Sequence, residues 1–170
     1  MPKNNREKSI GEYDKDTVRL GGYIYTSNNK LSSKLANDHI TQLTLLLVKL
    51  KGKDVFDIGC GDGTYTIDLF RQGKPRSIYG SDPSSEAIKS AKKTNPDPSR
   101  VDFRVGNIYS LPHKKFDLAV VRGVLHHLYE PEKALAGIVK VAKKILLIEP
   151  NGYNPILKII EKTSKYHLEH

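Results

Sequence analysis

The sequence predicts an α/β fold built on one mainly parallel sheet of about five strands. Short apolar segments alternate with amphipathic ones from about residue 32 to residue 148, which is typical of strands followed by helices. A glycine-rich segment, Gly59 to Gly63, joins the first strand to the next helix, and an aspartate, Asp82, follows the second strand. Parallel α/β proteins bind ligands at these places, beyond the carboxyl ends of their strands.

Five segments have the length and apolar character of strands, namely 55–58, 77–81, 101–105, 116–121 and 145–148. Apolar residues at helical spacing predict the helices between and around them, which are 32–50, 64–71, 83–93, 131–141 and 155–163. The first helix is expected to pack on the sheet through Leu35, Ile40, Leu43, Leu46 and Leu47. Gly73 is expected to cap the second helix. Because parallel neighbours need crossover connections, this alternation predicts a doubly wound sheet.

Composition and charge indicate one globular domain. The chain has 170 residues, of which 38% are hydrophobic and 28% charged. No apolar stretch approaches the ~20 residues that cross a bilayer, and residues 1–8 lack the apolar core of a signal peptide. With Cys60 as the single cysteine, no internal disulfide can form, so we expect a cytoplasmic protein.

The formal charge of +9 makes a nucleic-acid partner possible. The lysines are scattered in pairs without interleaved aromatic residues, however, so a solvated basic surface is favoured. No metal site is expected.

Three regions are expected along the chain. Residues 1–17 are polar and are interpreted as a tail, and residues 18–165 form the domain. Tyr23 and Tyr25 follow a Gly-Gly turn and are expected to help close the site. Residues 166–170 are either vector-derived or the point from which a longer natural chain continues.

The glycine loop has the spacing Gly-x-Gly-x-Gly, formed by Gly59, Gly61 and Gly63. A dinucleotide fingerprint would place its third glycine at position 64, which is a threonine here. The carboxylates of Asp57 and Asp62 would repel a pyrophosphate and attract an ammonium or sulfonium group. The loop therefore favours a cationic ligand over a dinucleotide.

The segment Asp57-Ile58-Gly59-Cys60-Gly61-Asp62-Gly63 resembles the first motif of the class I S-adenosylmethionine-dependent methyltransferases. The alternative is a glycine-rich turn without a ligand. The resemblance implies a three-layer Rossmann-like fold with strand order 3-2-1-4-5, and S-adenosylmethionine as the cofactor, released as S-adenosylhomocysteine. The cofactor-binding residues that it implies are Asp57, Gly59, Cys60, Gly61, Gly63, Asp82, Pro83, Asn107, Ile108 and Arg122.

Three of these residues have alternative interpretations or depart from the family pattern. Asp82 lies 23 residues after Gly59 and is expected to bind the ribose hydroxyls, or else to cap the next helix. Asn107 stands where the family usually has an acidic residue that holds the adenine amino group, with Ile108 beside the ring. Arg122 is expected to reach the cofactor carboxylate or the substrate, or to form an ion pair with a surface acid. Glu149, after the fifth strand, has the same two interpretations.

The segment from Phe116 to Leu128 resembles the fourth strand and following loop of relatives that act on small molecules or lipids. His126 and His127 are the candidate catalytic bases within it. The alternative is that these histidines orient the loop.

The favoured function is methyl transfer to a small-molecule or lipid-like acceptor. An RNA or protein methyltransferase is the alternative that the basic charge suggests, and a dehydrogenase is the least favoured enzyme. The chain lacks both the Asn/Asp-Pro-Pro-aromatic motif of adenine amino methylation and a cysteine placed for pyrimidine C5 chemistry.

Only 20 residues follow Pro150, too few for the antiparallel hairpin that completes the family's sheet. We therefore expect either a homodimer through the fifth-strand edge or coverage of that edge by the last helix. A non-catalytic S-adenosylmethionine-binding module completed by a partner chain is the alternative of another class.

Overall fold

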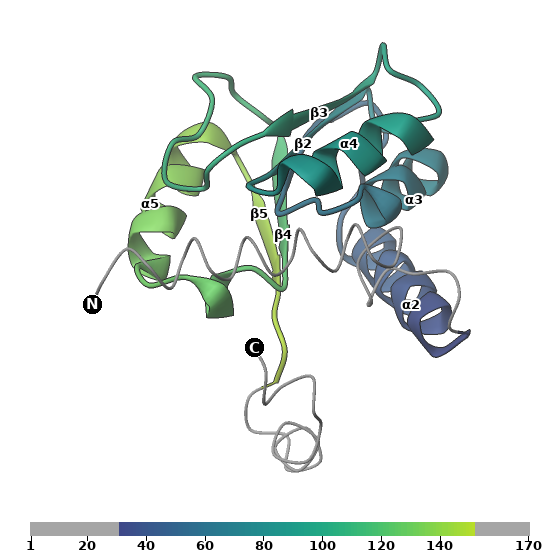
Figure 1. Ribbon diagram of the computed structural model, residues 1–170, viewed down its shortest axis with the longest axis horizontal. Helices are drawn as coiled ribbons and strands as arrows, with labels where there is room; N and C mark the ends of the chain where they lie inside the picture. The colour runs from purple at the N-terminus through teal and green to yellow at the C-terminus, as the bar shows by residue number, and fades with distance from the viewer. Residues whose placement is uncertain (1–30, 152–170) are drawn as a thin grey trace.

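A computed structural model describes residues 31–151 of the chain. Its centre is a five-stranded parallel sheet with the order β3-β2-β1-β4-β5 (Figure 1). The strands are β1 (Asp54–Ile58), β2 (Ser77–Asp82), β3 (Val101–Val105), β4 (Leu118–Arg122) and β5 (Ile145–Ile148). The predicted fold class and strand order are confirmed.

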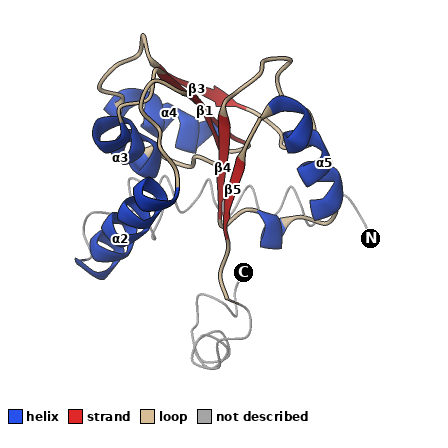
Figure 2. Ribbon diagram, turned by 180° about the vertical axis from the view of Figure 1, so that it is seen from behind, coloured by secondary structure: helices blue, strands red, loops and turns tan. Residues whose placement is uncertain are grey.

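Helices cover both faces of the sheet and make three layers. The helices α2 (Leu31–Leu47), α3 (Thr64–Gly73) and α4 (Ser85–Thr94) lie on one face, and α5 (Pro131–Val141) lies on the other (Figures 1 and 2). A short 3-10 turn, η1 (Leu125–His127), follows β4. Each strand connects to the next through a crossover, as parallel pairing requires.

Two apolar cores occupy the two faces of the sheet. Alternate residues of β1 point to opposite faces, so Val55 packs with Ile78 and Leu69 while Phe56 packs with Phe116. The Phe56 and Phe116 ring centroids lie 4.7 Å apart. Because both faces are buried, β4 has a continuous apolar run at residues 118–121.

Helix α2 packs through a different side from the predicted one. Ile40 is half-buried as expected, but Leu35, Leu43, Leu46 and Leu47 are 58%, 43%, 82% and 69% exposed. The buried side of the helix instead carries Asn37, Thr41 and Thr44, together with partly buried aliphatic residues. Helical periodicity shows that residues three or four apart share a side, but it does not show which side the tertiary fold covers.

The boundaries of three helices also differ from the predictions, and α2 ends at Leu47 instead of residue 50. Helix α3 runs through Gly73, and Lys74 adopts the left-handed conformation at its end, with φ 50°. Gly73 has a packing role instead, since a Cβ there would lie 2.6 Å from Cδ1 of Leu50. Helix α4 begins at Ser85, and its N-cap is Ser84, whose hydroxyl accepts a hydrogen bond from the amide of Ala87 at 3.0 Å.

Several predictions lie outside the described residues. These are the tail at 1–17, Tyr23 and Tyr25, the helix at 155–163 and the end at 166–170. Within residues 31–151, β5 pairs only with β4 and forms an edge of the sheet. No helix in this part of the chain is long and apolar enough to cross a membrane.

Candidate functional site

The predicted binding residues gather at the carboxyl edge of the sheet. The glycine loop follows β1, Asp82 ends β2, Asn107 follows β3 and Arg122 ends β4. Because the four strands are parallel neighbours, their ends lie side by side (Figure 1). The structure therefore brings together residues that are spread over 66 positions of sequence, from 57 to 122.

The glycine loop is a left-handed turn held against β2. Gly59, Gly61 and Gly63 have φ values of 77°, 54° and 79°, which side chains rarely adopt. The amides of Gly59 and Cys60 both donate to the carbonyl of Ser81, at 2.8 and 3.1 Å. The loop is thus a pre-formed backbone feature of this fold.

Packing within the protein also excludes side chains at two of these glycines. A Cβ on Gly59 would lie 2.3 Å from Cγ2 of Val124. A Cβ on Gly63 would lie 2.8 Å from Cζ of Phe103. Packing against Val124 and Phe103 is therefore a second reason, besides the positive φ, why these two positions are glycines.

Asp82 connects the glycine loop to the start of α4. Its Oδ2 accepts a hydrogen bond from the Gly61 amide at 2.9 Å, and its Oδ1 accepts one from the Ser84 amide at 2.9 Å. The side chain is 7% exposed. Asp82 does not cap α4, because Ser84 does. A carboxylate can accept several hydrogen bonds at once.

Asp57 lies beneath the loop rather than at its surface. It is 2% exposed, and its Oδ2 accepts a hydrogen bond from the hydroxyl of Thr66 on α3. Burial raises the pKa of Asp57 to about 6, against the opposing effects of Thr66 and Arg122. At neutral pH the carboxylate is still mainly ionised and contributes negative potential behind the loop.

Asp62 forms a local turn within the loop. Its Oδ1 accepts a hydrogen bond from the amide of Thr64 at 3.1 Å, at the start of α3. The side chain is buried, at 6% exposed. Together with Asp57 and Asp82, it places three carboxylates around one glycine turn.

The loop after β3 presents Asn107 beside a small cavity. The Asn107 side-chain oxygen accepts a hydrogen bond from the Tyr109 amide at 3.0 Å. The cavity, of about 140 Å³, is lined by Tyr79, Ser81, Val105, Gly106, Asn107, Ser110, Leu111 and Pro112. The half-buried side chain of Ile108 packs against the core on the α5 face.

Arg122 contacts side chains of α2 and α3. Its guanidinium donates to the side-chain oxygen of Asn37 on α2 at 2.5 Å and stacks on the ring of Tyr65, with 4.5 Å from Cζ to the ring centroid. Burial lowers the pKa of Arg122. The expected ion pair with a surface acid is absent among the described residues, because the side chain turns inward under α2.

Glu149 and His126 form a pair that holds the loop after β4. Glu149 Oε1 accepts hydrogen bonds from the amides of Val124 and Leu125, at 3.0 and 2.9 Å, and Oε2 lies 2.6 Å from Nδ1 of His126. Burial raises the pKa of Glu149, but these hydrogen bonds outweigh it and hold the pKa below its ordinary value. Glu149 therefore orients the loop directly, and His126 does so through Glu149.

His127 lies against His126, with the ring centroids 3.8 Å apart. Burial and the neighbouring His126 lower the pKa of His127. The contact of His126 with the Glu149 carboxylate, at 2.6 Å, fixes the orientation of the ring against which His127 packs.

Sequence reasoning did not identify Thr66, Tyr65 or Asn37 as part of this arrangement. Thr66 bonds Asp57, and Tyr65 and Asn37 hold Arg122. All three are polar residues on the buried sides of their helices. They can be recognised as part of the site only when the packing of α2 and α3 is known.

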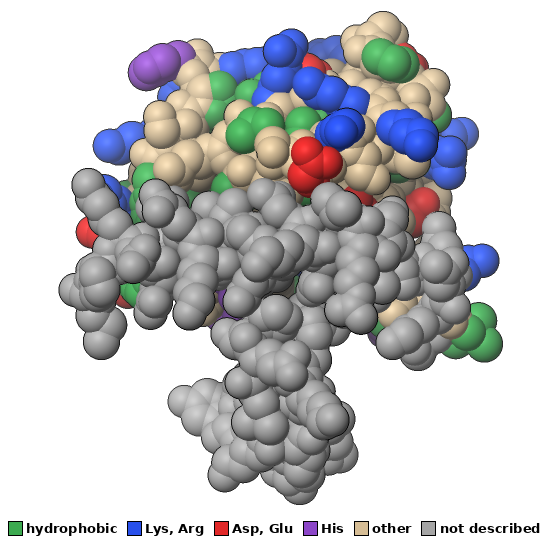
Figure 3. Space-filling view, viewed as in Figure 1, with side chains coloured by type: hydrophobic (Ala, Val, Ile, Leu, Met, Phe, Trp, Pro, Cys, Tyr) green, Lys and Arg blue, Asp and Glu red, His purple; other side chains and the backbone are tan. Residues whose placement is uncertain are grey.

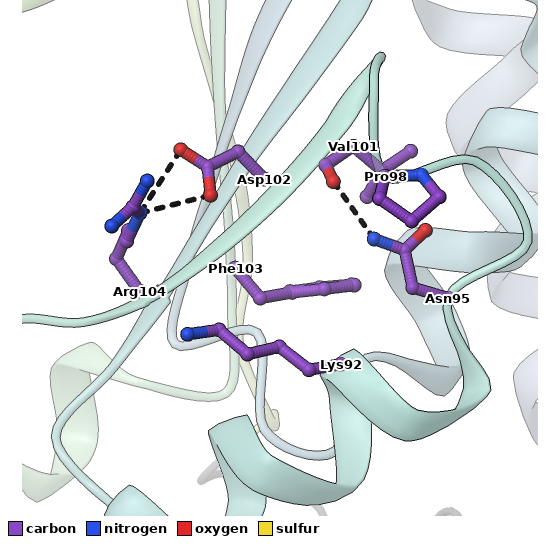
Figure 4. A pocket seen from close by; sticks show the side chains of 7 residues that line it. All are labelled: Lys92, Asn95, Pro98, Val101, Asp102, Phe103 and Arg104. Carbon is purple, nitrogen blue, oxygen red and sulfur yellow. Dashed lines mark hydrogen bonds and ion pairs between the residues drawn. The ribbon is translucent and has the colours of Figure 1, made fainter.

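A second cavity, of about 360 Å³, lies at the outer edge of β3 (Figure 4). Its polar groups largely satisfy one another. Arg104 pairs with Asp102 at 2.9 Å, and Asn95 donates to the carbonyl of Val101 at 2.8 Å. None of the predicted site residues lines this cavity.

Comparison with curated proteins identifies methyltransferase relatives. An uncharacterized methyltransferase of Schizosaccharomyces pombe is 30% identical over 74% of this chain and 49% of its own length. A tRNA U34 carboxymethyltransferase of Nautilia profundicola is 32% identical over 49% of this chain and 29% of its own. The mitochondrial ubiquinone biosynthesis O-methyltransferase of Homo sapiens is 33% identical over 55% and 27%. The chain thus spans about half or less of the length of these relatives.

Solved structures show the same fold. The magnesium protoporphyrin IX methyltransferase of Synechocystis with bound S-adenosylhomocysteine matches with a TM-score of 0.63 and 20% identity, over 80% of this chain and 67% of that one. The [4+2]-cyclase SpnF matches with a TM-score of 0.56 and 27% identity, over 68% and 42%.

The family model of a methyltransferase domain matches residues 49–168, which include the glycine loop, Asp82, Asn107 and the loop after β4. This chain belongs to the class I S-adenosylmethionine-dependent methyltransferase family.

Proposed function

We propose that this chain binds S-adenosylmethionine at the carboxyl edge of the sheet and transfers its methyl group to a small-molecule or lipid-like acceptor. The observation that carries the proposal is the hydrogen bond from the Gly61 amide to Asp82, at 2.9 Å. It joins the glycine loop of β1 to the acidic end of β2. Adjacent strand ends therefore offer a continuous surface for an elongated ligand.

The residues of this edge fit the cofactor's chemistry. Asp57, Asp62 and Asp82 provide negative charge around the loop, which suits a ligand with ammonium and sulfonium groups and disfavours a pyrophosphate. Asp82 would accept hydrogen bonds from the ribose hydroxyls, and Pro83 follows it at the same edge. Asn107 and Ile108 would hold the adenine. Gly59, Cys60, Gly61 and Gly63 would form the backbone surface beneath the ligand.

The loop after β4 supplies a candidate base. S-adenosylmethionine, when bound, supplies a methyl group activated by its sulfonium. The contact of His126 Nδ1 with Glu149 favours the tautomer that donates to the carboxylate. Nε2 would then have a lone pair that can take a proton from the acceptor. Glu149 would stabilise the resulting imidazolium.

The acceptor class is proposed from the segment after β4. The segment Leu125-His126-His127-Leu128 resembles the corresponding segment of family members that act on small molecules or lipids. The named relatives include both a tRNA enzyme and a ubiquinone enzyme. The charge of +9 favours RNA as the second candidate acceptor. Methyl transfer from labelled cofactor to quinol-like phenols and to total RNA separates the two.

A cofactor-binding module without methyl transfer is the candidate of another class. A structure that carries the name of a cyclase shares this fold at 27% identity, and one fold can serve different reactions. This candidate predicts binding of S-adenosylhomocysteine without turnover of any acceptor.

Calorimetric titration with S-adenosylhomocysteine tests the cofactor assignment. We expect Asp82→Asn to weaken binding by about tenfold or more, because a charge-assisted hydrogen bond contributes about 1.5 to 3 kcal/mol. Asp102→Asn is the matched control, since Asp102 lies on β3 and pairs with the exposed Arg104. If the wild-type chain binds NADH more tightly than S-adenosylhomocysteine, the proposal is wrong.

A further inference from the structure

Helix α2 carries five exposed leucines on its outer side. This leucine face consists of Leu31, Leu35, Leu43, Leu46 and Leu47, which are 72%, 58%, 43%, 82% and 69% exposed. The other large apolar side chains that are exposed in the described residues are scattered over β3, β5, α5 and the loop before α5. Isolated exposed apolar residues are ordinary, but a set on one helix face indicates a binding surface.

The inner side of α2 fixes the helix in this orientation. Thr44 and Tyr65 share a hydrogen bond of 2.5 Å between their hydroxyls, and Asn37 accepts one from Arg122 at 2.5 Å. Both bonds are made by fully or nearly fully buried α2 residues. Turning the leucine face inward would break these contacts. Within residues 31–151, the leucines therefore stay at the surface.

Basic side chains border the carboxyl-terminal end of the leucine face. Lys49 and Lys51 follow the helix and are exposed. Lys74 is placed beside them, because the Gly52 amide donates to the Lys74 carbonyl at 3.2 Å. No ion pair involves these three lysines within the described residues. Figure 3 shows hydrophobic side chains at the lower right, where α2 begins, with a basic side chain above them.

This combination favours an anionic lipid surface over a second copy of the chain. A second copy of the chain also carries a formal charge of +9, so it would bring no excess of negative charge to these lysines. An anionic bilayer presents apolar chains below negative headgroups, which matches leucines bordered by lysines. The charge of +9 on the whole chain acts in the same direction.

We propose that α2 docks this protein on anionic membranes, with the leucine face in the bilayer interface and Lys49, Lys51 and Lys74 against the headgroups. This inference is independent of the proposed methyl transfer, because it uses the side of α2 that faces away from the site. Docking of this kind is peripheral and reversible, and it weakens as salt screens the headgroups.

Flotation of the full chain with vesicles tests the proposal. One set of vesicles is phosphatidylcholine alone, and the other is an equal mixture of phosphatidylcholine and phosphatidylglycerol. We expect the wild type to float with the mixed vesicles several-fold more than with phosphatidylcholine, and less in high salt. The double variant Leu46→Gln/Leu47→Gln should bind about tenfold more weakly, because it removes apolar area from the interface.

Two further variants make the result specific. Lys49→Gln/Lys51→Gln should also lose about tenfold in binding to the mixed vesicles and little with phosphatidylcholine. Val139→Gln is the matched control, since Val139 is 65% exposed on α5, on the opposite face of the sheet, and we expect it to bind as the wild type does. Thermal unfolding by circular dichroism verifies that each variant is folded.

The proposal is overturned if the wild type does not float with the mixed vesicles. It is also overturned if Leu46→Gln/Leu47→Gln floats as well as the wild type. A lipid-free dimer that the same double variant converts to monomers would assign the leucine face to a second copy instead. Calorimetry with S-adenosylhomocysteine on the same preparations reports separately on the cofactor site.

Discussion

Gly59 shows how one position serves both backbone conformation and packing. Its φ of 77° allows the turn after β1, and its bare Cα lets the loop after β4 approach, with Val124 Cγ2 2.3 Å from where a Cβ would be. Val124 in turn is held by Glu149 through its amide. A change at Gly59 is therefore transmitted to the loop that carries His126.

We predict that Gly59→Ala lowers the free energy of unfolding by about 2 to 4 kcal/mol, from left-handed strain and overpacking together. Gly52→Ala separates the two causes, because Gly52 has φ 73° and no atom lies within 4 Å of where its Cβ would be. That control should cost only about 1 kcal/mol. Urea denaturation measures both variants. Equal losses of unfolding free energy in the two variants would show that Val124 moves aside without an energetic cost.

Asp57 is predicted to make stability depend on pH. Burial raises its pKa from 3.8 to about 6, so between these values the folded chain binds more protons than the unfolded chain. The free energy of unfolding therefore falls as pH rises through this window. Asp57→Asn should remove roughly 2 to 3 kcal/mol of this fall while keeping an acceptor for Thr66. Urea denaturation across the pH range measures it.

Asp54 is the control for that measurement, because folding lowers its pKa whereas folding raises the pKa of Asp57. Hydrogen bonds from Arg76 and Ser77 lower its pKa from 3.8 to about 2. Its stabilising effect is present above pH 3.8 and is lost as pH falls toward 2, and Asp54→Asn should remove that acid-side loss. Parallel curves for wild type and Asp57→Asn between about pH 4 and pH 6 would contradict the role given to Asp57.

At the scale of the element, the buried side of α2 carries three polar residues beside partly buried aliphatic ones, and its exposed side carries leucines. Asn37, Thr41 and Thr44 are 4%, 0% and 0% exposed. Asn37 and Thr44 have hydrogen-bond partners on β4 and α3, but the Thr41 hydroxyl has none among the described residues. A buried hydroxyl without a partner lowers stability, because it has lost its hydrogen bonds to water.

Thr41→Val should therefore raise the free energy of unfolding by about 1 kcal/mol, since it removes the unpaired hydroxyl and keeps the shape. Thr44→Val is the matched change in the same helix. It should lower the free energy of unfolding by about 1 kcal/mol, because it leaves the Tyr65 hydroxyl without its partner. Chemical denaturation of both variants decides the point, and destabilisation by Thr41→Val would mean that this hydroxyl does have a partner.

At the scale of the whole molecule, the sheet has two different edges. β3 ends one side and β5 the other, and Leu147 on β5 is 42% exposed. An uncovered strand edge offers backbone groups to another strand. Among the described residues, no element covers the free edge of β5 by strand pairing.

We predict a homodimer that pairs through β5. Leu147→Lys should shift it to monomers, because a lysine on an edge strand disfavours pairing with another strand. Val139→Lys on α5 is the control and should leave the dimer intact. Light scattering after gel filtration measures the mass. A monomeric wild type would contradict this prediction and favour coverage of the edge within one chain.

Much of this architecture follows from local signals. The strands, the crossover helices and the position of Asp82 can be predicted from the sequence, because apolar periodicity and turn residues depend only on residues that are close in the chain. The contacts of Arg122 are not, because they depend on Asn37, 85 positions away on another element. The outward orientation of Leu46 and Leu47 cannot be predicted from the sequence either. Both the exposed and the buried side of α2 carry apolar residues at helical spacing.

The sequence by itself determined the α/β class, the glycine turn and the order in which acidic and polar residues follow the strands. These features depend on backbone conformation and on alternation along the chain, which are local properties. Tertiary structure decided that Asp57 is buried with a raised pKa, that Glu149 holds His126 and that α2 presents its leucines outward. Burial and long-range hydrogen bonding set these outcomes, and both exist only when distant segments pack together.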